Sequence, residues 1–181
     1  MKKLAIVVVC LATTIVGYAQ GTFNFANKVT SAAINAPIFD AGGTLLAGDG
    51  YLAQLWAGPN AGGLVAVGDA VPFRTGAAAG YISGVGRTLP TAAWATPGAT
   101  VVLQFRAWAK SAGATWELAS ASGANFGQLA TPLSLASGGV GDPPGLPADL
   151  KGLTSFNLVP EPSIIALGVL GAAALVLRRR K

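Results

Sequence analysis

The chain has 181 residues, of which 52% are hydrophobic and only 10% are charged, and its formal net charge at pH 7 is +5. This composition excludes a disordered tail and a coiled coil, and the length allows one ordinary domain. The positive charge does not indicate nucleic-acid binding, because the excess cations lie at the two ends and residues 20–158 carry equal numbers of basic and acidic side chains.

The first 19 residues have the pattern of a secretory signal peptide. Two lysines precede an apolar run at residues 4–16, which is shorter than the ~20 residues that a membrane-spanning helix needs. Gly17 and Ala19 are small, as signal peptidase requires, so we expect cleavage between Ala19 and Gln20 and passage through the Sec translocon. The exported body then has no cysteine, because Cys10 is the only one in the chain.

Glycine and proline interrupt residues 20–158 too often for long helices and favour short strands joined by turns. The clearest strand is 101–108, where Val101, Leu103 and Phe105 share one face and Arg106 points the other way. Further strands are expected at residues 22–27, 51–57, 64–67, 71–74, 80–83, 115–119, 128–135 and 154–158, with a long loop at 136–149. This spacing predicts an all-β fold, an antiparallel β-sandwich of jelly-roll-like type.

Residue types that usually carry catalysis are scarce in this body. The chain contains no histidine, the usual general base and the commonest metal ligand. Without cysteine as well, zinc, copper and thiol-protease sites are not expected. No serine has the Gly-x-Ser-x-Gly surroundings of a hydrolase nucleophile, and the glycines at 84 and 86 are interpreted as a turn. We therefore expect no enzyme, no catalytic residues, no metal and no cofactor.

The carboxylates leave two alternatives open. A glycosidase needs only a carboxylate pair, which would come from Asp40, Asp49, Asp69 and Glu117. Asp40 and Asp49 could instead supply oxygen ligands to Ca²⁺. The three aspartates adjoin glycine or alanine in turn-like sequence, where such side chains commonly bind backbone N–H groups. Glu117 is expected to be a solvated strand residue.

The four tryptophans suggest a binding function. Flat indole rings stack on sugar faces, and a line of exposed rings would indicate a carbohydrate-binding module. In a body rich in alanine and glycine, however, at least two tryptophans are expected to fill the core. Trp56, Trp94 and Trp116 are the candidates for glycan stacking.

The C-terminal segment, residues 159–181, combines three parts. Pro160 and Pro162 fix their own φ angles and bias the preceding residue toward extended geometry, so that Glu161 is presented on a stiff turn. The apolar stretch that follows is predicted to form a short transmembrane helix over residues 163–177. A basic tail should stay cytoplasmic and leave the body outside; it consists of Arg178, Arg179, Arg180 and Lys181.

This order of turn, helix and basic tail resembles the PEP-CTERM sorting signal of bacterial exported proteins, and the resemblance is confined to residues 159–181 behind the signal peptide. It implies a cell that makes extracellular polysaccharide and a membrane enzyme, an exosortase, that recognises Pro160, Glu161 and Pro162 and removes the tail. We therefore expect an inner-membrane-anchored precursor that becomes a cell-surface or matrix protein. A plain membrane anchor, and a body that binds the polysaccharide, are the alternatives.

Overall fold

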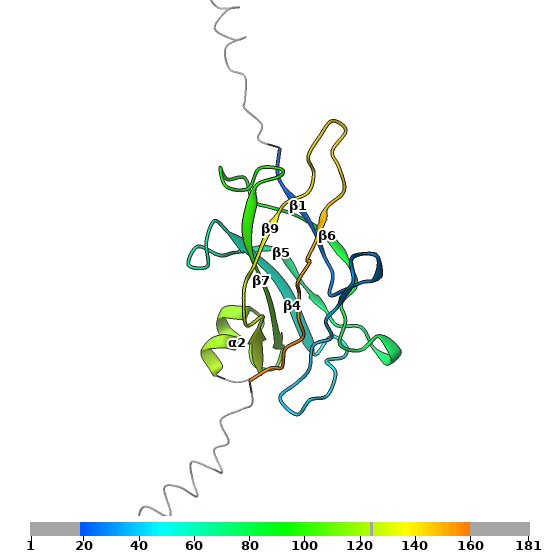
Figure 1. Cartoon of the computed structure of the whole chain (residues 1–181). Helices are drawn as coiled ribbons and strands as arrows, with labels where there is room; N and C mark the ends of the chain where they lie inside the picture. The colour runs from blue at the N-terminus through cyan, green and yellow to red at the C-terminus, as the bar shows by residue number, and fades with distance from the viewer. Residues whose placement is uncertain (1–18, 124, 160–181) are drawn as a thin grey trace, which may run out of the picture.

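The computed structural model describes residues 19–123 and 125–159. The predicted signal peptide up to residue 18 and the predicted transmembrane helix lie outside the described residues. Within the described part, two main β-sheets face a shared apolar core (Figure 1). The first described residues lie at one end of this sandwich and the last at the opposite end. The predicted all-β, antiparallel fold class is confirmed.

The smaller sheet has the strand order β10-β1-β6. Its strands are β1 (Thr22–Phe25), β6 (Val85–Thr88) and β10 (Ala148–Asp149). β1 pairs with β6 in the antiparallel sense and with β10 in the parallel sense. Phe23 and Phe25 are fully buried while the alternating residues Thr22 and Asn24 are half-buried, so this sheet turns one aromatic face to the core.

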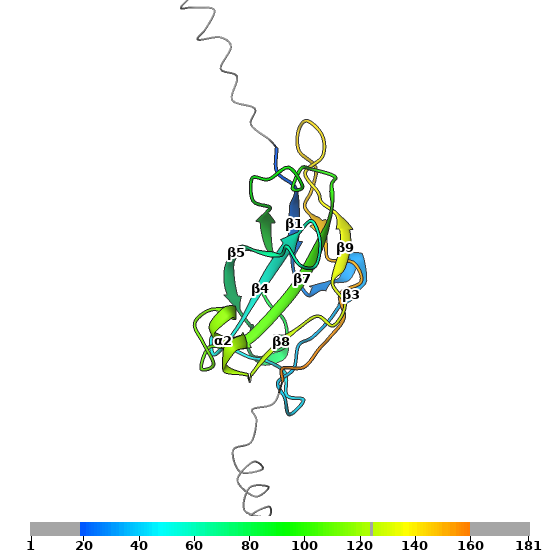
Figure 2. The ribbon, with the colours of Figure 1, turned by 90° about the vertical axis from the view of Figure 1, so that its left-hand side faces the viewer.

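The larger sheet is built around one long central strand. Its members are β4 (Tyr51–Gly58), β5 (Val65–Pro72), β7 (Thr100–Ala109), β8 (Phe126–Gln128) and β9 (Leu133–Ala136). β7 pairs with β4 on one side and, on the other, with β9 and then β8 along its length. Figure 2 shows β5, β4 and β7 side by side. The larger sheet therefore presents one face to the core and a second face outward.

One apolar core joins the two sheets. The predicted face of Val101, Leu103 and Phe105 on β7 is buried, as expected, and the Phe105 ring lies 4.9 Å from that of Phe25 on β1. A second, smaller cluster lies on the outward face of the larger sheet, where Trp108 and Trp116 pack with Ala119. The outward face is therefore partly covered as well.

The segment predicted as a strand at residues 115–119 is instead part of helix α2 (Trp116–Ser122). Trp116 and Ala119, three positions apart, both face inward and are buried, which is a helical spacing. The helix ends at Gly123, whose φ of 81° is the left-handed conformation that glycine adopts without strain. In a segment of only five residues, the spacing of apolar side chains does not distinguish a helix from a strand.

The other differences between the predicted and the observed strands concern where strands begin and end. The predicted strands 64–67 and 71–74 are largely one strand, β5, because an irregularity opposite Gln54 accommodates the three intervening residues, Gly68 to Ala70. The predicted strand 128–135 is split into β8 and β9 around Pro132, which cannot donate a ladder hydrogen bond. The predicted strand 80–83 makes only the single bridge between Phe73 and Ile82.

Four short strands and two 3-10 turns were not predicted. β6 lies where a turn was predicted, and β10 lies inside the predicted loop 136–149. β2 (Lys28–Val29) and β3 (Ile34–Asn35) pair with each other, and a 3-10 turn, η1 (Thr30–Ala32), joins them. A second such turn is η2 (Gly76–Ala78). Among the described residues, no helix has the length and apolar character needed to cross a bilayer.

Candidate functional site

The chain leaves the body through a hydrogen-bonded segment rather than a free linker. The predicted strand 154–158 forms only an isolated bridge, between Asn157 and Phe39. The segment is nevertheless held on both sides: the Phe39 N–H donates to the Phe156 carbonyl at 3.1 Å, and the Leu158 N–H donates back to the Phe39 carbonyl at 2.9 Å. The body therefore continues to the last residue before the proline turn.

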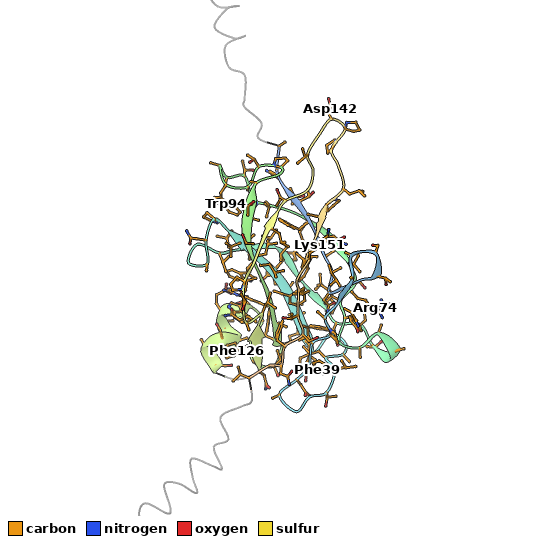
Figure 3. The ribbon with its side chains drawn as sticks, in the orientation of Figure 1. Phe39, Arg74, Trp94, Phe126, Asp142 and Lys151 are labelled. Carbon is orange, nitrogen blue, oxygen red and sulfur yellow. The ribbon has the colours of Figure 1, made fainter. Side chains whose placement is uncertain are left out.

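Both backbone groups of Val159 are hydrogen-bonded to the start of β8 and the residue before it. Its N–H donates to the Phe126 carbonyl at 2.8 Å, and its carbonyl accepts from the Asn125 N–H at 2.9 Å. Its side chain is 45% exposed, while that of the preceding Leu158 is 2% exposed. Phe126 and Phe39 lie at the same end of the sandwich, opposite Trp94 (Figure 3). Pro160, Glu161, Pro162 and the basic tail lie outside the described residues.

At the N-terminal side, the two residues flanking the predicted signal-peptide cut differ in their contacts. Ala19 is exposed, whereas the Gln20 side chain donates to the Thr91 hydroxyl. The next N–H, of Gly21, donates to the Ala95 carbonyl at 2.7 Å. A body that starts at Gln20 therefore keeps these contacts.

The outward face of the larger sheet carries a row of polar side chains beside a tryptophan. The strand register aligns Gln54 on β4, Arg106 on β7 and Gln128 on β8 across the sheet. Trp56 lies on the same face of β4, two residues from Gln54. Sequence reasoning placed Arg106 on this face but did not identify it as a site residue, because its neighbours come from the strand register.

The Arg106 guanidinium on this face contacts two aromatic rings. Its guanidinium carbon lies 4.1 Å from the centre of the Trp56 ring and 4.8 Å from that of Trp116. Burial lowers the pKa of the Arg106 guanidinium, and the nearby Glu117 carboxylate opposes this shift. Within the described residues, Arg106 Nε and Trp56 Nε1 are buried without a hydrogen-bond partner. The cation therefore lies against two indole faces, with the Glu117 carboxylate near enough to act on it electrostatically.

The structure does not gather the three predicted glycan-stacking residues on one face. Trp56 is half-buried on the outward face, and Trp116, on the inner side of helix α2, is 7% exposed. Trp94 is half-buried and packs against the main core. Trp108 is also buried, and its indole N–H donates to the Gly113 carbonyl at 3.0 Å. Trp56 and Trp116 thus share the outward face, but Trp116 is buried, so Trp56 is the predicted stacking residue that is partly exposed there.

Among the candidate carboxylates, the hydrogen bonds of Asp40 are local. Asp40 Oδ1 accepts backbone N–H groups of Gly42 and Thr44 at 2.9 and 2.8 Å, which closes its own loop. Glu117 is exposed in the first turn of α2. Within the described part of the chain, no three Asp, Glu, His or Cys side chains cluster to hold a metal. These contacts match the turn interpretation of Asp40.

Comparison with known proteins identifies the segment that begins inside this C-terminal junction. Residues 158–181 match the PEP-CTERM protein-sorting motif. The PEP-CTERM motif implies an exported protein that is membrane-anchored through its C-terminus and is then processed by an exosortase-like enzyme. No curated protein and no solved structure matches the chain. The motif therefore identifies the sorting route and leaves the activity of the body to be inferred from its own residues.

Proposed function

We propose that this chain is a surface or extracellular-matrix protein that carries no catalytic activity and is trimmed out of the inner membrane through its PEP-CTERM segment. The observation that carries the proposal is the motif at residues 158–181, which joins a folded body directly at Val159. The N-terminal signal peptide supplies export, with the cut between Ala19 and Gln20. The basic tail holds the C-terminus in the cytoplasm until the enzyme acts.

The absence of histidine from the whole chain and of cysteine after residue 10 supports a non-catalytic body. The contacts of Gln20 and Gly21 support the proposed signal-peptide cut, because a body that begins at Gln20 retains them.

Mass spectrometry of the protein from its native cell tests the trimming. With a working sorting enzyme, we expect a mature chain that begins at Gln20 and lacks residues 163–177. In a strain without that enzyme, the same protein should keep its tail and fractionate with the inner membrane. A retained tail in cells with the working enzyme would leave a plain membrane anchor.

A second candidate function is binding of the extracellular polysaccharide through the outward face of the larger sheet. The observation that favours it is the row of Gln54, Arg106 and Gln128 beside the half-buried Trp56. Amides and a guanidinium donate hydrogen bonds to sugar hydroxyl and carboxylate oxygens, and a ring beside them offers a stacking surface. Arg106 favours a polysaccharide with acidic sugars, although Glu117 partly neutralises its charge.

Retention of the purified body on the immobilised polysaccharide of its own cell tests this second candidate. Gln128→Ala changes an exposed side chain and should weaken retention severalfold without unfolding the body, and Arg106→Gln should do the same or more. Arg74→Gln removes an exposed cation elsewhere and is the matched control. Equal retention of all variants, or no retention of the wild type, would exclude this binding face.

A further inference from the structure

The residues that precede the proline turn have their backbone groups engaged by the body. The N–H groups of Leu158 and Val159 donate to Phe39 and Phe126, and the Val159 carbonyl accepts from Asn125, at distances of 2.8 to 2.9 Å. Val159 is the last described residue, and neither its N–H nor its carbonyl is free.

Packing reinforces these hydrogen bonds. Leu158 is 2% exposed and belongs to the main core. Gly127 on β8 lies against the backbone of this segment: a Cβ at Gly127 would lie 2.8 Å from the Asn157 carbonyl oxygen and 3.2 Å from the Leu158 Cα. The segment 156–159 is therefore bound between Phe39 and β8, and its removal would take the buried Leu158 out of the core and leave the Phe39 and Phe126 carbonyls without these partners.

An enzyme that cuts a peptide chain has to reach the backbone on both sides of the bond. Extended peptides are commonly bound through their own N–H and C=O groups, as an added strand. In residues 158 and 159 the body already uses these groups. A cut before Val159 would require the enzyme to break the hydrogen bonds of both residues, whereas a cut directly after Val159 disturbs only the bond from the Asn125 N–H and keeps every residue of the segment in the body.

We propose that the sorting enzyme cuts on the tail side of Val159, so that the mature protein keeps residues 156–159 as the folded edge of its body. This inference rests on the proposed trimming. In the hydrolytic step, water adds to the carbonyl carbon, the C–N bond breaks, the body gains a carboxylate and the departing tail gains an amino group.

Peptide mapping of the mature protein from its native cell distinguishes a cut after Val159 from an earlier cut and from no cut. We expect a C-terminal peptide that includes Val159 and lacks residues 163–177. A mature C-terminus at Leu158 or earlier would refute the inference while leaving the trimming correct. A full-length C-terminus would refute the trimming itself, and the inference with it.

Digestion of the mature protein with a non-specific serine carboxypeptidase tests, without the sorting enzyme, whether the body protects residues 156–159 from cleavage. We expect digestion of the wild type to stop at or just after Val159. Leu158→Ala removes a buried anchor and should allow at least tenfold faster loss of residues 156–159, whereas Val159→Ala changes a half-exposed side chain and should not. Equal digestion of wild type and Leu158→Ala would show that the body does not protect this segment.

Discussion

The guanidinium carbon of Arg106 lies 4.1 Å from the centre of the Trp56 ring, and the two residues occupy diagonal positions on the neighbouring strands β7 and β4. Trp116 of helix α2 contacts the same cation from 4.8 Å. The helix and the outward face of the larger sheet are therefore joined through one arginine. Removal of this cation should weaken the attachment of the helix.

We expect Arg106→Ala to lower the free energy of unfolding of the body by about 2 kcal/mol, because the cation–π contacts and the packing of the aliphatic stem are both lost. Urea denaturation of the purified body measures this change. Arg74→Ala removes an exposed arginine and should change stability by less than about 0.5 kcal/mol. Similar losses in both variants would mean that the two indoles contribute nothing through Arg106.

A buried asparagine joins three separate segments of the chain. Asn27 is fully buried; its Nδ2 donates to the carbonyls of Ala36 and Gly80, each at 2.8 Å, and its Oδ1 accepts from the Ile82 N–H at 3.0 Å. Asn27→Ala removes the partner of the Ala36 carbonyl and of the Ile82 N–H, while the Gly80 carbonyl keeps the Ile38 N–H, and should cost about 3 kcal/mol of stability in urea denaturation. Asn60→Ala, at an exposed loop position, should cost less than about 1 kcal/mol.

Gly127→Ala should lower the free energy of unfolding by about 1 to 3 kcal/mol, because the added Cβ would lie 2.8 Å from a backbone oxygen. Gly86→Ala is the matched control, since a Cβ there meets nothing within 4 Å. Hydrogen exchange should show where stability is lost. The amides of Leu158 and Val159 should exchange faster in Gly127→Ala than in the wild type, and at the wild-type rate in Gly86→Ala. Unchanged exchange in both variants would contradict the close packing of β8 on this segment.

Two variants of the C-terminal segment should distinguish enzymatic sorting from simple membrane anchoring. Replacing Arg178, Arg179, Arg180 and Lys181 by glutamine removes the cations that keep this end cytoplasmic, and we expect release of the protein with its tail uncut. Glu161→Gln keeps those cations and should leave the protein membrane-held and unprocessed. Cell fractionation with mass analysis measures both. Normal trimming of both variants would show that neither the cations nor the Glu161 carboxylate is recognised.

Period-2 alternation predicted the central strand correctly because β7 is long and one of its faces lies in the core. The same reasoning failed at 115–119, where Trp116 and Ala119 form the buried side of a helix. Gly123 is the residue type that commonly follows the last turn of a helix, and it marks the end of this one.

The environment of Arg106 could not be predicted from the sequence. Trp56 and Trp116 are fifty and ten positions away from it along the chain, and only the pairing of β4 with β7 and the docking of α2 bring them together. Period-2 alternation gives the face of a strand, but it does not give the partner strand or the register. The C-terminal motif, in contrast, is contiguous in sequence and was identified without the fold.

The body begins and ends at opposite ends of the sandwich, and Asp142 lies at the end where it begins (Figures 1 and 3). In the proposed precursor, in which the tail anchors the body beyond Val159, we therefore expect the loop around Asp142 and the start of the body at Gln20 to lie on the side away from the membrane. A fluorescent reporter inserted between Ala19 and Gln20 would then stand one body length above the lipid. Its energy-transfer distance to a membrane dye should increase when the protein is released.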